Sequence, residues 1–314
     1  MKYLITGATG LIGSALVKKL ASESAIMVCP VRSIEKARSL FNPMIFNTVQ
    51  WIETSLEEYL KNLSDNFDFI IHCASPTASK YFVDCPVETL QFNINTTTAL
   101  LDFACKYVVK GLVFLSSLES YGTVLDDKSA IDEDFQGYVN PMEARSSYNM
   151  AKRVCECLCH AYAVEFGVPV KVVRLTQTIS PFIAHDDMRV FAQFARQAAN
   201  GEDIVLHTEG NSSRQYIHVD DAVEAILYVL QKGAPGEAYN AAREDSYISV
   251  RNMAEFVQHN FNPQRTVKLQ LRDDMGYAPT TKIRLDMHKI RNLGWVAKKG
   301  LYEMYRDLIL QLKR

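Results

Sequence analysis

The first half of the chain alternates short runs of apolar, largely β-branched residues with longer stretches in which apolar residues recur every three or four positions. The short runs predict buried strands, and the longer stretches predict amphipathic helices. The predicted strands cover residues 3–6, 26–31, 69–72, 112–116 and 170–175. The predicted helices cover residues 11–21, 55–63, 86–107 and 147–166. This alternation predicts an α/β fold with a parallel, doubly wound sheet.

The alternation becomes less regular after about residue 176. Helical periodicity returns at residues 190–200 and at residues 220–231, where Asp220 and Asp221 open the helix. No repeat, low-complexity tract or flexible linker separates the two halves. We therefore expect one domain over residues 1–175, rejoined by a later segment at about 215–240. A smaller C-terminal α/β domain is expected over residues 176–314.

The composition argues against several classes of function. The chain has 314 residues, of which 48% are hydrophobic, and a net charge of −2. It therefore has ample material for a core and no basic patch for nucleic acid. The longest apolar runs are too short to cross a bilayer, so no membrane segment is predicted. No signal peptide is predicted either, and we expect a cytoplasmic protein.

Seven cysteines are scattered through the apolar runs, which predicts reduced thiols rather than a disulfide framework. Three of them, Cys155, Cys157 and Cys159, lie in one predicted helix. Cys155 and Cys159 share a helix face while Cys157 points elsewhere, a spacing unlike that of zinc knuckles. We therefore predict that these cysteines pack in the core, and we predict no metal site.

A glycine-rich turn joins the first predicted strand to the first predicted helix, and it reads GATGLIG over residues 7–13. At such a position glycines permit a tight turn and bring backbone N–H groups to a pyrophosphate at the helix N-terminus. The turn therefore predicts a Rossmann-type dinucleotide site. Its candidate contacts are Gly7, Thr9, Gly10, Leu11, Ile12 and Gly13.

The end of the second predicted strand bears on the choice between NAD and NADP. An acidic side chain at this place would bind the free ribose 2′-hydroxyl of NAD. The chain has Arg32 there instead, with Lys36 and Arg38 nearby. Arg32 is a candidate contact for the 2′-phosphate of NADP, although a solvated basic turn would have the same sequence. We expect NAD or NADP, with NADP slightly favoured.

Tyr148 and Lys152 are four residues apart in a predicted helix and therefore lie on one face. A neighbouring ammonium lowers the pKa of a tyrosine, so that the phenolate can act as a general base. Ser117 follows the strand at 112–116, and ligands of open α/β sheets bind at the carboxyl ends of strands. Ser117 is thus expected to hydrogen-bond the substrate oxygen that Tyr148 deprotonates.

Together these motifs resemble the extended short-chain dehydrogenase/reductases of the NAD-dependent epimerase/dehydratase family, which typically act on nucleotide sugars. The resemblance also rests on the segments 68–74 and 214–221 and on Asn93. It implies that Ser117, Tyr148 and Lys152 are the catalytic trio. It also implies that Tyr148 and Lys152 contact the cofactor, with Lys152 holding the nicotinamide ribose. The other contacts that it implies are Ala74 and Asn93 for the cofactor, and Ser75, Gln177, Arg189 and Arg214 for a nucleotide sugar.

Within this family the segments 72–93, 137–153 and 187–194 resemble UDP-glucuronate decarboxylases most. In that branch, and in the dTDP-glucose 4,6-dehydratases, a glutamate stands two residues after the catalytic hydroxyl, as Glu119 does here. Dehydratases place an aspartic acid between the two, where this chain has Leu118. Oxidation of the sugar at C4 creates a keto group that promotes loss of CO2 or of water. Glu119 therefore indicates lyase chemistry, and Leu118 argues against a standard dehydratase.

The chain also departs from the decarboxylase pattern. Phe182 replaces an arginine that would partner an acidic substrate, and Thr96 stands where glycine is usual. The polar residues His185, Asp186 and Asp187 in the loop after Phe182 are candidate substrate contacts. The alternative is an epimerase or an NADPH-dependent keto-sugar reductase, in which Glu119 is a solvated charge on a turn.

A third interpretation comes from a different class of protein, a regulator that senses dinucleotides without catalysis. The basic turn at Arg32 suits such a protein, but the presence of all three trio residues argues against it. The resemblance further implies a homodimer that pairs the helix of Tyr148 with its neighbour. Phe103, Cys105 and the run from Cys155 to Cys159 are expected to supply the apolar surface.

Overall fold

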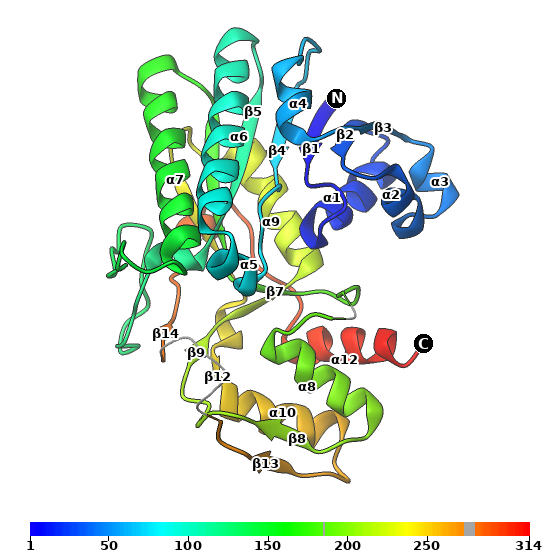
Figure 1. Ribbon diagram of the computed structural model, residues 1–314, viewed down its shortest axis with the longest axis vertical. Coiled ribbons are helices and arrows are strands. Elements are labelled where there is room, and N and C mark those ends of the chain that lie inside the picture. Colours follow the sequence, from blue (N-terminus) through cyan, green and yellow to red (C-terminus); the bar gives the residue numbers. More distant parts are fainter. Residues whose placement is uncertain (185, 273–279) are drawn as a thin grey trace.

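The computed structural model describes residues 1–184, 186–272 and 280–314 (Figure 1). Within these residues, a seven-stranded parallel sheet has the order β11-β6-β5-β4-β1-β2-β3. Its strands are β1 (Lys2–Thr6), β2 (Ile26–Val31), β3 (Val49–Glu53), β4 (Phe69–His72), β5 (Gly111–Ser117), β6 (Val170–Leu175) and β11 (Ala238–Ala241). The direction of winding reverses between β1 and β4. The predicted doubly wound α/β fold is therefore confirmed.

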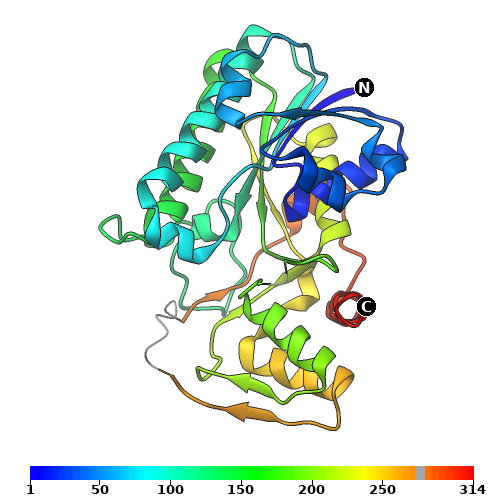
Figure 2. The same cartoon turned by 45° about the vertical axis from the view of Figure 1, so that its right-hand side comes forward.

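Helices cover both faces of the sheet (Figures 1 and 2). One face carries α4 (Leu56–Lys61), α6 (Pro86–Lys106) and α7 (Ser146–Phe166), and the other carries α1 (Leu11–Ser22) and α9 (Val219–Lys232). Alternate strand residues supply the two cores, so that Leu4 packs toward α6 and α7 while Ile5 packs toward α1 and α9. Because both faces are buried, these strands appear in the sequence as continuous apolar runs.

The C-terminal lobe has its own core. Three helices pack around it, α8 (Val190–Asn200), α10 (Val250–Phe261) and α12 (Leu301–Leu312). Parallel pairs join β7 (Gln177–Ile179) to β10 (Tyr216–His218) and β8 (Ile204–Leu206) to β13 (Val267–Leu269). A third small sheet places β9 (Ser213–Arg214) between β12 (Ile248–Ser249) and β14 (Lys282–Ile283). Between β10 and β12 the chain returns to the large sheet, to which it contributes α9 and β11.

The remaining elements are short, and sequence periodicity did not predict them. They are α2 (Ile34–Leu40), α3 (Pro43–Phe46), α5 (Ser79–Asp84), α11 (His288–Asn292) and the 3₁₀ turns η1 (Leu118–Tyr121) and η2 (Glu244–Ser246). β3 at the edge of the sheet was also not predicted, because its sequence VQWIE mixes apolar and polar residues. An edge strand is paired along one side only and needs no continuous apolar run.

Two of the three clustered cysteines of α7 pack in the core as predicted, and the third does not. Cys155 and Cys159 are fully buried against α6, while Cys157 is exposed. Phe103 is also buried in this core. Phe103, Cys155 and Cys159 therefore cannot form the dimer surface that was expected of them, whereas Cys105 is exposed.

Across the described ranges, no helix is both long and apolar enough to cross a bilayer. In the same part of the chain, His, Cys, Asp and Glu side chains form no group of three or more that could hold a metal.

Candidate active site

The glycine turn after β1 packs with no space for side chains. Gly7 has a φ of +69°, and a Cβ on it would lie 2.8 Å from the backbone nitrogen of Ala74. A Cβ on Gly13 would clash with the carbonyl oxygen of Gly7. Gly10 begins α1 without a side-chain capping bond, so no capping side chain covers the N–H groups of the first helical turn. This cradle fits the pyrophosphate of NAD(P), which the N–H groups near Leu11 would hold.

Behind the turn, the side chain of His72 ends β4 in full burial. Its Nδ1 lies 2.7 Å from Thr6 Oγ1, and its Nε2 lies 3.4 Å from Thr96 Oγ1. Burial lowers the pKa of His72 to about 3, and the charge of Lys152 lowers it further in the same direction. His72 is therefore a neutral structural residue. Thr96, at a position where the family pattern has glycine, supplies one of its two hydroxyl partners.

The three side chains predicted as the catalytic trio are neighbours at the carboxyl end of β5. Ser117 is the last residue of this strand, and Tyr148 and Lys152 lie in the first two turns of α7. Lys152 Nζ donates to the carbonyl oxygen of Leu115 at 2.8 Å and lies 5.5 Å from the centre of the Tyr148 ring. The side chain of Ser117 lies near enough to Tyr148 to lower the pKa of its phenol. This arrangement suits proton transfer to and from one substrate oxygen.

Electrostatics in this structure hold Tyr148 in its protonated form. Burial raises the pKa of Tyr148 well above its ordinary range, and the charge of Glu119 raises it further, whereas the nearby side chain of Ser117 lowers it. A bound NAD(P) would supply the hydride-accepting group, and the positive charge of its oxidised form would favour the phenolate of Tyr148. Deprotonation of Tyr148 would therefore require nearby positive charge, such as that of a protonated Lys152.

Lys152 gives the site a predicted pH dependence. Burial lowers the pKa of Lys152 to about 8. The ammonium is thus present below pH 8 and is lost as the pH rises through that value. We expect kcat/KM to fall above about pH 8, because deprotonated Lys152 no longer favours the Tyr148 phenolate. Initial rates across a pH series test this, and a rate that stays constant well beyond pH 8 would contradict it.

Glu119 lies on η1 and faces the catalytic helix. Its Oε2 accepts hydrogen bonds from Arg145 Nη1 at 3.3 Å and from Asn149 Nδ2 at 3.4 Å. The hydroxyl of Ser117 accepts the backbone N–H of Glu119 at 3.2 Å. The Glu119 side chain is 28% exposed, whereas Leu118 beside it is buried in the core. Glu119 is therefore held between the strand end and α7, and Leu118 is placed away from the reaction.

An aromatic side chain covers Tyr148. The ring of Phe82, on α5, stacks on the Tyr148 ring with centroids 4.2 Å apart and 9° between the ring planes. Phe82 is itself buried, and its carbonyl oxygen accepts a hydrogen bond from Ser147 Oγ at 3.1 Å. The stack fixes the orientation of the phenol ring and adds to its desolvation.

The predicted substrate residues differ in their availability. Gln177 begins β7 and is half-buried. Arg189 forms a two-point ion pair with Asp187, with Nε–Oδ1 at 3.0 Å and Nη2–Oδ2 at 2.5 Å. Arg214, half-buried on β9, makes no ion pair within the described residues. Arg189, by contrast, is already paired with a carboxylate of its own loop. His185 lies outside the described residues.

The predicted cofactor contacts beyond the turn lie along the same edge of the sheet. Ala74 follows β4, and its N–H donates to Thr6 Oγ1 at 3.2 Å. Asn93 is fully buried on α6 and accepts a hydrogen bond from Ser75 Oγ at 2.8 Å. This bond joins a predicted cofactor residue to a predicted substrate residue. Arg32 is exposed immediately after β2.

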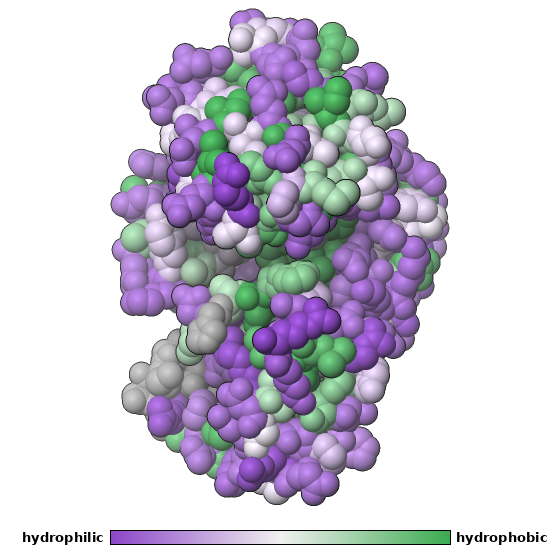
Figure 3. All heavy atoms as spheres, turned by 90° about the vertical axis from the view of Figure 1, so that its right-hand side faces the viewer, coloured by the Kyte–Doolittle hydropathy of each residue, from purple (hydrophilic) through white to green (hydrophobic). Residues whose placement is uncertain are grey.

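A cavity of about 390 Å³ opens between the two lobes. Figure 3 shows the molecule hollowed between its upper and lower parts on this face. Leu11 and Lys18 of α1 line one side of the cavity, and Phe182 and Lys299 line the other. Lys18 Nζ lies 4.2 Å from the centre of the Phe182 ring. Of the predicted cofactor contacts, Leu11 lines this cavity, and none of the trio residues does.

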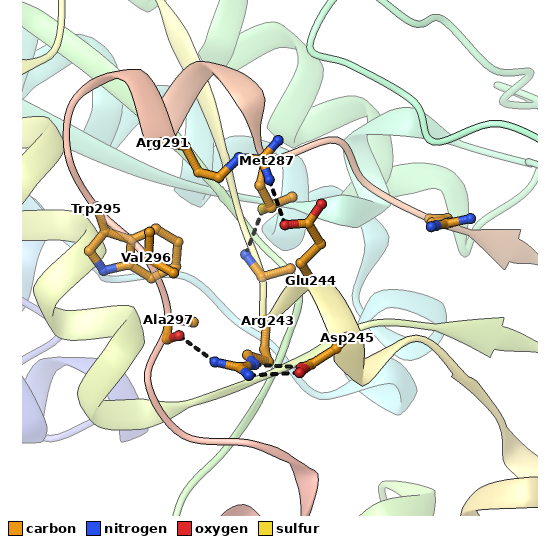
Figure 4. A pocket seen from close by; sticks show the side chains of 10 residues that line it. Arg243, Glu244, Asp245, Met287, Arg291, Trp295, Val296 and Ala297 are labelled. Atoms are coloured by element: carbon orange, nitrogen blue, oxygen red, sulfur yellow. Dashed lines mark hydrogen bonds and ion pairs between the residues drawn. The ribbon is translucent and has the colours of Figure 1, made fainter.

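A second cavity of about 390 Å³ lies beyond the carboxyl end of β11 (Figure 4). Two of its three arginines are engaged by neighbouring groups. Arg243 pairs with Asp245 and donates to the Ala297 carbonyl oxygen, and Arg291 pairs with Glu244 at 2.7 Å. None of the predicted site residues lines this cavity, so it has no part in the predicted chemistry.

Three residues near the trio had no role assigned from the sequence. Arg145 lies just before α7 and Asn149 lies one residue after Tyr148, and both contact Glu119. Helical periodicity does not reveal these tertiary contacts. Phe82 gave no local signal either, because its contact with Tyr148 joins two helices far apart in the sequence.

The chain is similar in sequence to known proteins along most of its length. Across 99% of this chain and 90% of the relative, the chain is 28% identical to UDP-glucuronic acid decarboxylase 3 of Arabidopsis thaliana. It is 30% identical to UDP-glucuronic acid decarboxylase 1 of Xenopus tropicalis, over 73% of this chain and 53% of that protein.

Solved structures share the fold. UDP-glucose 4-epimerase of Thermotoga maritima superposes with a TM-score of 0.84 at 23% identity, over 100% of this chain and 99% of that one. The dTDP-glucose 4,6-dehydratase of Bacillus anthracis, solved in complex with NAD, gives 0.81 at 19% identity, over 99% and 96% of the two chains. Residues 3–242 match the profile of the NAD dependent epimerase/dehydratase family. The match spans the glycine turn, the trio and the return of the chain to the large sheet, and the chain belongs to the NAD-dependent epimerase/dehydratase family.

Proposed function

We propose that this enzyme oxidises a nucleotide sugar at C4 and then removes CO2 from it, as a UDP-glucuronate decarboxylase does. The observation that carries the proposal is the placement of Glu119. Arg145 and Asn149 hold its carboxylate beside the trio, and Leu118 is buried away from it. A carboxylate at this place can transfer a proton at C5, the carbon next to the oxidised C4. A simple reductase needs no such proton transfer. Full-length similarity to UDP-glucuronic acid decarboxylases supports the same substrate class.

In this proposal each residue has a defined part. Tyr148 takes the proton of the sugar C4 hydroxyl, Ser117 hydrogen-bonds that oxygen, and Lys152 supplies the positive charge that makes the phenolate accessible. The resulting 4-keto group lies β to the C5 carboxylate, so the C5–carboxylate bond breaks and its electrons pass into an enolate. Glu119 is placed to donate the proton that C5 then gains. The hydride that NAD(P) would take from C4 would return to that carbon, so the final product would differ from the substrate by one CO2. Arg214 would bind the diphosphate.

A sugar labelled with deuterium at C4 tests the oxidation step. We expect UDP-glucuronate carrying this label to turn over several-fold more slowly than the unlabelled sugar, because the C4–H bond breaks during turnover. Deuterium at C5 is the matched control and should leave that step unaffected. Turnover that is insensitive to the C4 label under single-turnover conditions would refute oxidation at C4.

An epimerase or keto-sugar reductase is the second candidate, and a specific observation favours it. Two arginines near the site are already neutralised by the chain's own carboxylates, Arg145 by Glu119 and Arg189 by Asp187. Phe182 occupies a further place where the decarboxylase pattern has arginine. A sugar without a carboxylate would need fewer cations. Strict dependence on added NADPH, with conversion of a keto sugar, would favour this candidate.

We propose that the cofactor is NAD or NADP and that Arg32 favours NADP. Its exposed position directly after β2 supports a contact with a 2′-phosphate, while NAD occupies the solved dehydratase of the same fold. Arg32→Ala should weaken NADP binding roughly ten-fold, the value of one charge-assisted hydrogen bond, and leave NAD binding unchanged. Fluorescence titration with both cofactors measures this. Equal losses for NAD and NADP would contradict a 2′-phosphate contact.

Homodimerisation through α6 and α7 stays a prediction. The outer face of α7 carries exposed apolar side chains, among them Val154, Val164 and Phe166, in place of the buried residues first expected there. Sedimentation of the purified protein tests this association.

A further inference from the structure

A buried ion pair lies one helical turn beyond Lys152. It joins Glu156 on α7 to Arg174 on β6, and the two side chains are only 11% and 9% exposed. Arg174 Nη2 lies 2.7 Å from Glu156 Oε2, and its Nε lies 3.1 Å from Oε1. A two-point pair of this kind fixes the positions of both side chains.

The same carboxylate is also bound to β5. Ser116 Oγ donates a short hydrogen bond to Glu156 Oε1. Ser116 and Arg174 are register partners on adjacent strands, so the three side chains join α7 to β5 and β6 at one level. Ser116 stands between Leu115, whose carbonyl oxygen accepts Lys152 Nζ, and the trio residue Ser117. The contacts of Glu156 therefore fix the strand segment that the trio uses.

Arg174 extends the connection to the turn that carries Glu119. Its Nη1 donates to the hydroxyl of Tyr121 at 3.0 Å and to the carbonyl oxygen of Glu133 at 2.6 Å. Tyr121, fully buried at the end of η1, donates in turn to Asn240 Oδ1 at 2.7 Å. One buried network thus connects the catalytic helix, the end of β5 and η1.

We propose that Ser116, Glu156 and Arg174 form a positioning clamp that keeps α7 in register with β5, so that Tyr148 and Lys152 face Ser117. The inference rests on the proposed function of these three as the catalytic trio. Stability alone does not account for the clamp, because a well-packed apolar group in place of a buried ion pair is often neutral or stabilising. In this proposal the clamp residues do not contact the substrate. They affect the reaction only by holding the trio residues in position.

Glu156 also acts on Lys152 through its charge. It raises the pKa of Lys152 and so opposes the effect of burial. The titratable groups that act on Lys152 or face it come from α7 and from the end of β4, and they are Tyr148, Cys155, Glu156, Cys159, His72 and Cys73. Glu156 is the carboxylate of this set. Loss of its charge should therefore make Lys152 lose its proton at lower pH.

Glu156→Gln tests the clamp, because glutamine keeps the shape and loses the charge. We expect kcat for the nucleotide sugar to fall roughly ten- to a hundred-fold with KM little changed, as misplacement of a catalytic group predicts. Because Lys152 is proposed to hold the nicotinamide ribose, NAD(P) binding should weaken as Lys152 loses its proton. In the variant this weakening should occur at a lower pH, a readout that requires no turnover. Glu209→Gln removes one partner of the exposed pair Glu209–Arg251 and should change neither quantity.

A double variant, Glu156→Met with Arg174→Met, separates positioning from stability and covers the case in which Glu156→Gln does not fold. The apolar pair should recover the thermal midpoint but neither kcat nor the pH dependence of cofactor binding. Recovery of wild-type kcat and of the wild-type pH dependence in the double variant would overturn the clamp. If the wild-type protein turned over no nucleotide sugar, the proposed function would fail, while the pH dependence of cofactor binding would still test the clamp.

Discussion

Tyr148→Phe should lower kcat by roughly 10³-fold while the fold and cofactor affinity are retained. Proton transfer by a positioned side chain contributes about 10²- to 10⁴-fold, and this variant removes the group that transfers the proton. The phenylalanine ring should keep its stack on Phe82, whose centroid lies 4.2 Å from that of Tyr148. Lys152 keeps its bond to the Leu115 carbonyl oxygen. Steady-state rates with the preferred nucleotide sugar, together with a cofactor titration, measure both parts of this prediction.

Tyr162→Phe is the matched control on the same helix. Tyr162 lies near the other end of α7 and bonds to Asp102 at 2.6 Å, far along the helix from the trio. Its loss should leave kcat unchanged. A Tyr148→Phe enzyme that kept most of the wild-type rate would show that another group moves the proton, and the proposed trio would be wrong.

Glu119→Gln is expected to have the second largest effect, a fall of roughly 10²-fold in formation of the decarboxylated product. The amide keeps the shape of the side chain but cannot carry charge or exchange a proton as a carboxylate does. Oxidation at C4 depends on Tyr148 rather than on Glu119, so it should continue. The variant should therefore release more keto sugar relative to final product than the wild-type enzyme does, as chromatography of the reaction mixture would show.

Glu143→Gln serves as the control for this variant. Glu143 is an exposed glutamate in the segment before α7 and accepts a hydrogen bond from Asn140 at 2.9 Å. Glu143→Gln should therefore leave both the rate and the ratio of keto sugar to final product unchanged. If Glu119→Gln gave wild-type rates and the same product, Glu119 would be a solvated charge and the epimerase or reductase would become the better proposal.

The central sheet could be predicted from the sequence because burial on both faces demands continuous apolar runs. The strands that became β1, β2, β4, β5 and β6 all have this property. β11 was not predicted, because its sequence AYNA is short and contains Asn240, whose side chain bonds to Tyr121 inside the core. Asn240 is fully buried on this edge strand, and a buried polar side chain needs a tertiary partner that sequence periodicity does not reveal.

In the candidate site, too, some residues could be predicted from local patterns and others depend on tertiary contacts. Four-residue helical spacing places Tyr148 and Lys152 together, and the end of an apolar run locates Ser117. The partners that orient them come from distant segments. Phe82 precedes Tyr148 by 66 positions in the numbering, and Arg174 meets Glu156 from the next strand. Nothing local in the sequence marks these contacts, because each depends on how helices and strands pack.

The product formed from UDP-glucuronate tests the central proposal most directly. The purified protein is incubated with UDP-glucuronate and NAD or NADP, and in parallel with UDP-glucose, UDP-N-acetylglucosamine and dTDP-glucose, and each product is analysed by mass spectrometry. We predict that UDP-glucuronate loses one CO2 and that Tyr148→Phe abolishes this loss. Loss of one water from dTDP-glucose, or isomerisation of a UDP-hexose with UDP-glucuronate left intact, would contradict decarboxylation as the reaction.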